Sequence, residues 1–213
     1  MERGCAFKQP EGVFIDLDFL KTLPKKQIQN GLGEIIKYGI IKDKFLFAML
    51  EDNIDKIFKL NLEIMEKIIF RCAQIKAKVV EKDEFDKKDI RIILNYGHTL
   101  AHAIETATNY TNEYFRGEAV ALRMLMASDI AVNLDMFTQP NFDRLKILLI
   151  AAGLPTFVKG VSLSKIQSVY LLDKKFTKGT TRFVLPRSIG KVVVVDDLPE
   201  LLIKSVVKKY VRK

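Results

Sequence analysis

The sequence has no tryptophan, only two cysteines and only two histidines among its 213 residues. Cys5 and Cys72 form neither a disulfide framework nor a zinc knuckle, and so few cysteines are typical of a reducing compartment. No stretch approaches the roughly 18 uncharged apolar residues of a membrane span, and the N-terminal MERGCAFKQPEG lacks the apolar run of a signal peptide. These absences exclude a disulfide scaffold and a membrane protein, and we expect a cytoplasmic protein.

The formal net charge of +9 suggests nucleic acid as one candidate partner. The basic residues are scattered, however, and the densest runs are Lys25-Lys26 and the C-terminal KSVVKKYVRK, without the aromatic interleaving that suits base stacking. A solvated basic surface explains most of this charge, and an anionic small-molecule substrate is a second use for part of it. We therefore expect no nucleic-acid partner and no membrane partner.

The apolar periodicity is helical over most of the chain. It predicts helices between residues 25 and 80, from about 90 to 108, from 117 to about 134, in QPNFDRLKILLIA, in SLSKIQSVYLL and after Pro199. A short β-type run at 13–17 and a hairpin made of TRFVLP and KVVVV are the predicted sheet elements. The predicted fold class is mainly α, with a short N-terminal strand and a small β-hairpin near the C-terminus.

Both histidines lie in NYGHTLAHAIE, four residues apart, which is a helical spacing suited to metal ligands. Winding residues 91–107 at 100° per residue places five polar side chains within an arc of about 80°: Arg91, Asn95, His98, His102 and Glu105. An amphipathic helix with its polar face in water is the simplest interpretation. Against it, arginine, asparagine and histidine are side chains that bind anions and metals. Gly97 inside a helix costs about 1 kcal/mol relative to alanine, which indicates that something approaches closely there.

Five more charged residues have two interpretations each. Glu34 and Lys37 are one helical turn apart among isoleucines. They form either a functional site or a surface ion pair that contributes little to stability. Lys76 interrupts an apolar ridge at four-residue steps, so it either extends to the surface or points inward as a cation available to an anion. Lys174 and Lys175 precede the predicted hairpin, where a solvated turn is the commoner outcome.

Taken together, GLGEIIKYGIIKD, KAKVVEKDE, RIILNYGHTLAHAIE, RGEAVALRM and DKKFTKGTTRFVLPRSIGK resemble, in this order, the C-terminal domain of 3-dehydroquinate synthase. The resemblance covers almost the whole chain. It implies a multi-helical domain over residues 24–213 that carries metal and substrate groups, preceded by residues 1–23 as a remnant of the inter-domain junction. It also implies a Rossmann-like NAD-binding domain that precedes this segment in the family and is absent from these residues.

The family converts 3-deoxy-arabino-heptulosonate 7-phosphate to 3-dehydroquinate and phosphate in the shikimate pathway, with NAD and a divalent metal, zinc or cobalt. The resemblance implies the same lyase function here, inactive without the NAD domain. Two alternatives stay open. One is another sugar-phosphate cyclase of the inosose or valiolone type, and the other is a non-catalytic helical binding module derived from the synthase. A separate chain carrying the NAD domain and a second copy in a homodimer are the protein partners left open.

The resemblance also implies roles for single residues. Glu34 and His98 fall on metal-ligand positions, and His102 and Lys37 fall on catalytic positions. The positions that bind the anionic groups of the substrate are Lys76, Arg91, Asn95, Lys174 and Lys175. The third family ligand is the histidine of HGEAVA, where this chain has Arg116 in RGEAVA. Guanidinium has no lone pair to offer, so we expect an ion pair between Arg116 and Glu34 and no tightly held zinc.

Overall fold

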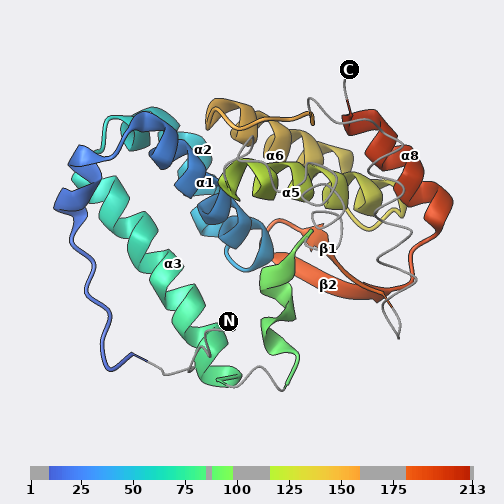
Figure 1. The fold of residues 1–213 in the computed structure, drawn as a ribbon, viewed down its shortest axis with the longest axis horizontal. Coiled ribbons are helices and arrows are strands. Elements are labelled where there is room, and N and C mark those ends of the chain that lie inside the picture. The colour runs from blue at the N-terminus through green and yellow to red at the C-terminus, as the bar shows by residue number, and fades with distance from the viewer. Residues whose placement is uncertain (1–9, 85–87, 98–115, 159–180, 212–213) are drawn as a thin grey trace, which may run out of the picture.

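The structure is a computed structural model that describes residues 10–84, 88–97, 116–158 and 181–211. Helices dominate these residues, and one two-stranded antiparallel sheet lies near the C-terminus (Figure 1). The predicted mainly α class is therefore confirmed. None of the helices in these ranges combines the length and the apolar character that crossing a bilayer requires.

The first three helices follow the predicted periodicity and are joined by short turns. They are α1 (Lys25–Ile41), α2 (Lys44–Phe58) and α3 (Leu62–Lys82). The side chains of Asp43 and Asn61 accept hydrogen bonds from backbone N–H groups in the first turns of α2 and α3. Such caps satisfy donors that have no partner within the helix, and they define where each helix begins.

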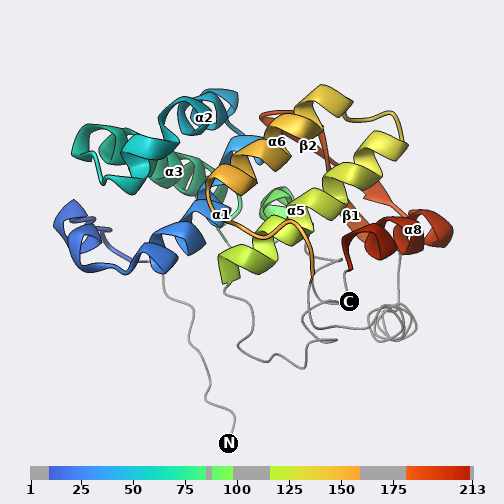
Figure 2. The ribbon, with the colours of Figure 1, turned by 90° about the horizontal axis from the view of Figure 1, so that it is seen from above.

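The central element is α5 (Arg116–Asn133), which is buried on almost every side from Val120 to Ala131. It packs against α1 and against three other elements around it (Figures 1 and 2). These are α6 (Gln139–Ala151), α8 (Glu200–Tyr210) and the strand β1 (Arg182–Ser188). A helix that is apolar all round has to be buried, so α5 organises the core.

The predicted hairpin is confirmed. Strand β1 pairs antiparallel with β2 (Lys191–Asp196), from Arg182 opposite Asp196 to Ser188 opposite Lys191. Gly190 closes the turn with a φ of +87°, which favours glycine because it has no Cβ. The helix predicted for SLSKIQSVYLL lies outside the described residues.

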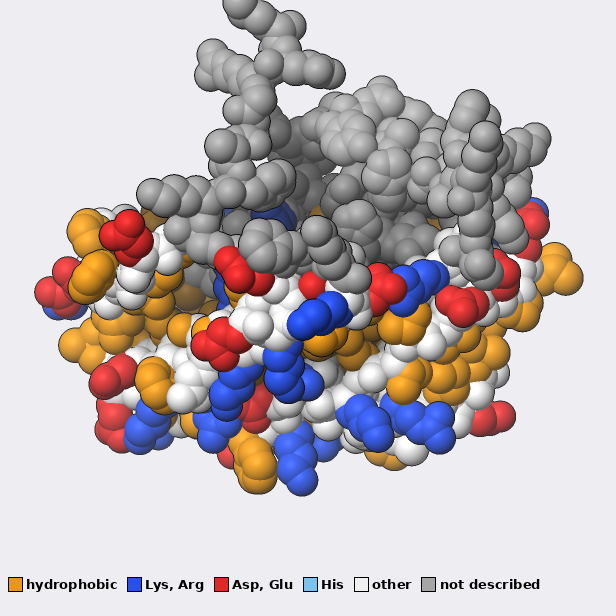
Figure 3. Space-filling model, turned by 90° about the horizontal axis from the view of Figure 1, so that it is seen from below, with side chains coloured by type: hydrophobic (Ala, Val, Ile, Leu, Met, Phe, Trp, Pro, Cys, Tyr) orange, Lys and Arg blue, Asp and Glu red, His pale blue; other side chains and the backbone are white. Residues whose placement is uncertain are grey.

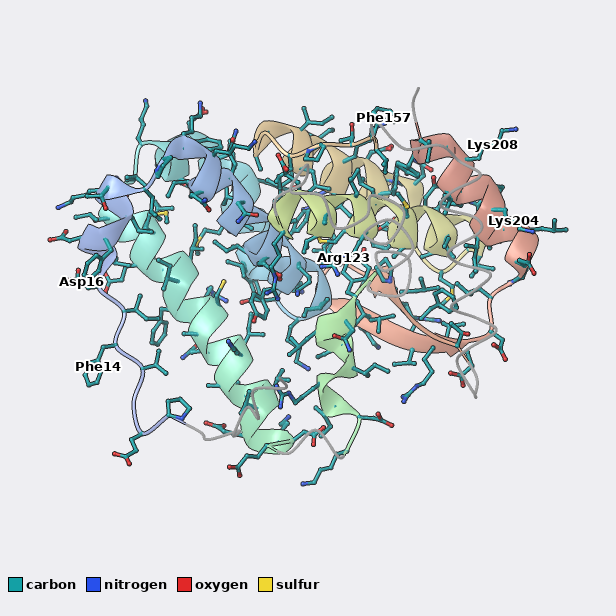
Figure 4. The ribbon with its side chains drawn as sticks, viewed as in Figure 1. Phe14, Asp16, Arg123, Phe157, Lys204 and Lys208 are labelled. Atoms are coloured by element: carbon teal, nitrogen blue, oxygen red, sulfur yellow. The ribbon has the colours of Figure 1, made fainter. Side chains whose placement is uncertain are left out.

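The predicted N-terminal strand is wrong. Residues 13–16 belong to no strand, and Asp16 caps the 3₁₀ helix η1 (Leu17–Thr22) that follows. A strand needs a neighbour for its N–H and C=O groups, and no strand among the described residues pairs with this segment. The side chain of Phe14 is 99% exposed, and it extends away from the rest of the fold in Figure 4.

The single helix predicted from about 90 to 108 is also wrong in its first half. The 3₁₀ helix η2 (Ile90–Asn95) ends before Tyr96, and Gly97 has a φ of +74°. A Cβ at Gly97 would lie 2.8 Å from the Cβ and the backbone oxygen of Arg123 on α5. The chain therefore leaves the helix where it passes against α5. The close approach that Gly97 indicated is confirmed, and residues 98–108 lie outside the described residues.

The charged side chains form a mixed surface where the structure shows them. On the face seen in Figure 3, Lys and Arg side chains lie interspersed with Asp, Glu and apolar groups. Several basic residues are paired with acids, as Arg144 is with Glu51 and Lys204 is with Glu200. This pattern is typical of a solvated surface, and the expected lack of a nucleic-acid partner stays a prediction.

We expect the thiol of Cys72 on α3 to react slowly in the folded protein. Burial, with a smaller contribution from the nearby Asp43, raises the pKa of Cys72 to about 12. Since only the thiolate reacts, labelling by dithionitrobenzoate at pH 8 should be on the order of 10³-fold slower in buffer than in guanidinium chloride. The Cys5→Ser variant isolates the signal of Cys72. Equal labelling rates in both solutions would contradict this expectation.

Asp129 connects α5 to the last helix. Its carboxylate is 4% exposed, accepts a hydrogen bond from the Tyr210 hydroxyl at 2.9 Å and pairs with Lys209 Nζ at 2.7 Å. Asp129→Ala leaves that buried hydroxyl without this acceptor, which costs about 1–3 kcal/mol of unfolding free energy. Urea unfolding measures the loss, and Asp143→Ala on the exposed face of α6 is the control. Equal losses in the two variants would refute the role of this connection.

Candidate functional site

Two glycines bring α1 and the start of α5 into backbone contact. A Cβ at Gly33 would lie 2.5 Å from the backbone oxygen of Gly117, and a Cβ at Gly117 would lie 1.9 Å from the backbone oxygen of Asn30. The side-chain oxygen of Asn30 also accepts a hydrogen bond from the backbone N–H of Gly117. This contact places Glu34 of α1 beside Arg116, the first residue of α5.

Glu34 is held between two cations. Lys37 Nζ lies 2.5 Å from Glu34 Oε2, and Arg116 Nε lies 3.3 Å from Glu34 Oε1. Lys37 is buried, with 8% of its surface exposed, whereas the side chain of Arg116 is 84% exposed. Both carboxylate oxygens therefore face a positive charge, and the predicted pair between Arg116 and Glu34 is confirmed.

Opposing effects set the ionisation of this pair. Burial by itself would raise the pKa of Glu34, but attraction to Lys37, Arg116 and Arg123 outweighs it and lowers that pKa. Burial also lowers the pKa of Lys37, and the two arginines add to this lowering while Glu34 opposes it. Arg123 lies beside the upper end of η2 in Figure 4, where Gly97 approaches it. Among the described residues, three cations on two helices thus act on the one carboxylate of Glu34.

The described residues do not fit the divalent metal that the resemblance implies. A structural or catalytic metal needs several lone-pair donors directed at one point. Here both oxygens of Glu34 face cations, and the guanidinium of Arg116 has no lone pair. No three His, Cys, Asp or Glu side chains in the part of the chain that the structure describes lie close enough to hold an ion. The second predicted ligand, His98, lies outside it.

The other predicted substrate residues on described elements are Lys76, Arg91 and Asn95. Lys76 is exposed on α3, so of its two interpretations the structure supports the surface one. Arg91 is half-buried on η2, and its Nη1 donates to the backbone oxygen of Glu84 at 3.4 Å. Asn95 is exposed at the end of the same 3₁₀ helix, which packs against α3. Their convergence on one anion stays a prediction.

The remaining predicted site residues are His102, Lys174 and Lys175, and they lie outside the described residues. Asn30 is a residue that the sequence analysis missed, although it fixes the start of α5 against α1. The signal that could have found it is the pair of glycine motifs, GLGE and RGEAVA. Glycine on each of two helices indicates that their backbones approach closely, and a polar side chain next to such a contact is placed to bond across it.

Comparisons with known proteins agree with the motifs. A family model described as 3-dehydroquinate synthase C-terminal matches residues 31–176. The chain is 42% identical over 205 residues to the 3-dehydroquinate synthase of Desulforamulus reducens. It is 44% identical over 206 residues to that of Nostoc punctiforme. The chain belongs to the 3-dehydroquinate synthase family.

The match to the synthase family is partial in length. The two alignments cover 96% and 95% of this chain but 56% of each relative, so the chain spans little more than half the length of the curated relatives it matches. The resemblance that the motifs predicted is thereby confirmed for the C-terminal part of the synthases.

Solved structures of related cyclases share the fold. A 2-epi-5-epi-valiolone synthase from Streptomyces hygroscopicus with NAD+ and Zn2+ bound superposes with a TM-score of 0.81 at 24% identity, over 92% of this chain and 54% of its own. A 2-deoxy-scyllo-inosose synthase complexed with carbaglucose-6-phosphate, NAD+ and Co2+ superposes with a TM-score of 0.63 at 22% identity, over 92% and 55%. At these identities the likeness establishes the architecture and not the reaction.

Proposed function

We propose that this chain supplies the helical, substrate-binding part of a 3-dehydroquinate synthase-type active site. The observation that carries the proposal is the family match over residues 31–176, together with 42–44% identity to curated synthases. The proposed substrate is 3-deoxy-arabino-heptulosonate 7-phosphate, and the proposed products are 3-dehydroquinate and phosphate. The inosose and valiolone synthases are less similar in sequence, at 22–24% identity, which favours the synthase over these alternatives.

Binding of an anionic sugar acid is the part of this function that the residues of the chain support best. Arg91 and Lys76 supply positive charge from η2 and α3, two elements in contact, and Asn95 adds an amide donor. Charge-assisted hydrogen bonds from such groups bind phosphate and carboxylate strongly. By resemblance, Lys174 and Lys175 join them, Lys37 is a catalytic residue that also contacts the anionic substrate, and His102 assists proton transfer.

The proposal assigns NAD binding to another polypeptide segment. A dinucleotide site needs a strand, a glycine-rich turn and a helix in a parallel sheet, and the one sheet among the described residues is an antiparallel hairpin. Residues 24–213 would then be the substrate domain, and residues 1–23 its junction with the NAD-binding part. The exposed Val13, Phe14 and Phe19 support a contact with such a partner, because clustered exposed apolar groups mark interaction surfaces. A homodimer and a cytoplasmic location stay predictions.

Calorimetry with heptulosonate phosphate tests the proposed binding. We expect the wild-type chain to bind this ligand and Arg91→Gln to bind it about 10-fold or more weakly, since a hydrogen bond to a charged group contributes about 1.5–3 kcal/mol. Arg187→Gln removes an exposed arginine of β1 and is the matched control. A wild-type chain that binds no heptulosonate phosphate, or an Arg91→Gln variant that binds it normally, would count against the proposal.

A non-catalytic binding module derived from the synthase is the second candidate function. The ion pair between Arg116 and Glu34 favours it, because the pair occupies a carboxylate that the resemblance assigns to the metal. Mixing the chain with NAD, cobalt and the separately produced N-terminal half of a relative discriminates the two candidates. Release of phosphate from heptulosonate phosphate in this mixture supports a split enzyme, and its absence supports the module.

A further inference from the structure

Asp83 is a buried carboxylate outside the cluster of charges around Glu34. It follows the last residue of α3, and 2% of its surface is exposed. Its Oδ1 accepts a hydrogen bond from the backbone N–H of Lys88 at 3.0 Å, and its Oδ2 accepts one from the backbone N–H of Ile90 at 3.1 Å. A buried carboxylate needs such bonds to replace its contacts with water. Asp83 therefore ties the end of α3 to the start of η2.

The two N–H groups flank a residue with an uncommon backbone conformation. Asp89 has a φ of +57°, in the left-handed region that residues other than glycine rarely adopt. Such a conformation persists where the surrounding structure holds it. The bonds from Lys88 and Ile90 to Asp83 lie on either side of it. The carboxylate of Asp89 also pairs with Arg182 Nη1 on β1 at 3.0 Å. Contacts from α3 and β1 thus fix the turn that leads into η2.

The other end of η2 is anchored as well. Tyr96 follows the last residue of η2, is 1% exposed, and has its hydroxyl 3.1 Å from the backbone oxygen of Met124 and 2.5 Å from Ser128 Oγ on α5. The 3₁₀ helix, drawn in green, contacts α3 and both strands of the hairpin (Figure 1). Between the two anchors lie the half-buried Arg91 and the exposed Asn95. The segment that carries these two predicted anion-binding residues is therefore held at both ends.

We propose that Asp83 is a positioning residue, which fixes η2 so that Arg91 and Asn95 meet an anionic substrate from a segment that is already ordered. The inference rests on the proposed function, which assigns these two residues to substrate binding. Asp83 acts through the backbone of η2 and not by contact with the substrate. A ligand binds more weakly in proportion to the share of molecules in which its binding segment is out of place. A preordered segment avoids this loss.

Calorimetry with heptulosonate phosphate on two alanine variants tests the role of Asp83. Asp83→Ala removes an acceptor from two backbone N–H groups, so η2 is in place in fewer molecules and the variant should bind the ligand about 10-fold or more weakly. Asp43→Ala is the matched control, because Asp43 also accepts hydrogen bonds from two backbone N–H groups, those of Phe45 and Leu46 at the start of α2. The control should lose stability and keep the wild-type affinity.

A double-mutant cycle separates positioning from general destabilisation. In an Arg91→Gln background, Asp83→Ala should weaken binding less than it does in the wild type, since one of the two side chains that it positions is already gone. An equal loss in both backgrounds would assign Asp83 to stability alone and overturn the inference. Asp83→Asn keeps one acceptor oxygen, so its affinity should lie between those of the wild type and Asp83→Ala. If Asp83→Ala does not fold, Asp83→Asn takes its place in every comparison.

Amide hydrogen exchange reports the order of η2 without any ligand. The N–H of Ile92 donates to the backbone oxygen of Asp89 at 3.4 Å, next to the turn that Asp83 holds. Its exchange should be faster in Asp83→Ala and unchanged in Asp43→Ala. Unchanged exchange in Asp83→Ala, or an equal loss of affinity in the two alanine variants, would overturn the inference. A wild-type chain that binds no heptulosonate phosphate contradicts the proposed function, and the exchange of Ile92 then shows separately whether Asp83 orders η2.

Discussion

Replacing Arg116 by histidine should raise the affinity of the chain for zinc by at least about 100-fold, since even partners behind a metal ligand contribute 10- to 100-fold. The substitution has two effects in the same direction. It removes the cation that lies 3.3 Å from Glu34 Oε1, and it supplies an imidazole nitrogen that can ligate. With the predicted ligands Glu34 and His98, the variant would offer the three protein ligands that a zinc site requires.

Calorimetry on metal-free protein measures this gain, and two variants separate its causes. Arg116→Ala removes the cation without adding a ligand, so it should give only part of the increase. Arg144→His places an imidazole next to Glu51, a glutamate that has likewise lost its arginine partner, and should leave zinc affinity unchanged. If Arg116→His and Arg144→His bound zinc equally well, the gain would come from any exposed histidine and the interpretation would be wrong.

The helical part of the fold could be predicted because its information is local. Helices α1, α2 and α3 follow the apolar period, and α6 ends at Ala151, two residues before Gly153, whose φ of +72° continues no helix. The hairpin of β1 and β2 has its turn residue, Gly190, within its own sequence, and the apolar residues of β1 are buried. In each case the residues that determine the element lie within it or at its ends.

The two wrong elements depend on contacts between distant residues. Residues 13–17 have the composition of a strand, but composition supplies no neighbouring strand. Residues 90–97 have a helical period, yet Gly97 passes against Arg123 of α5 and the backbone turns there. Tertiary packing overrode the local preference in the second case, and no periodicity could have shown it.

The candidate site likewise has a part that the sequence predicts and a part that required the structure. The pair between Arg116 and Glu34 could be predicted because two motifs place a cation and a carboxylate on family positions that lie together. The action of Arg123 and the buried Lys37 on the same carboxylate required the structure, since the motifs reveal neither the position of Arg123 near Glu34 nor the burial of Lys37. The role of Asn30 also required it, because its partner Gly117 is 87 residues away.

Replacing Gly117 by alanine should destabilise the chain by about 3 kcal/mol or more, because the added Cβ has no space. It would lie 1.9 Å from the backbone oxygen of Asn30 and 2.7 Å from its side-chain oxygen. A backbone atom cannot move aside as a flexible side chain can, so α5 has to shift away from α1. That shift also lengthens the contact between Arg116 and Glu34.

Thermal unfolding followed by circular dichroism measures the effect, for which we expect a drop in melting temperature of roughly 10 °C. Gly31→Ala is the matched control, because Gly31 lies in α1 and a Cβ there meets nothing within 4 Å. Alanine has a better helix propensity than glycine, so the control should gain up to about 1 kcal/mol. A Gly117→Ala protein as stable as Gly31→Ala would show that α1 and α5 do not meet at backbone distance. The position of Glu34 beside Arg116 would then lose its structural basis.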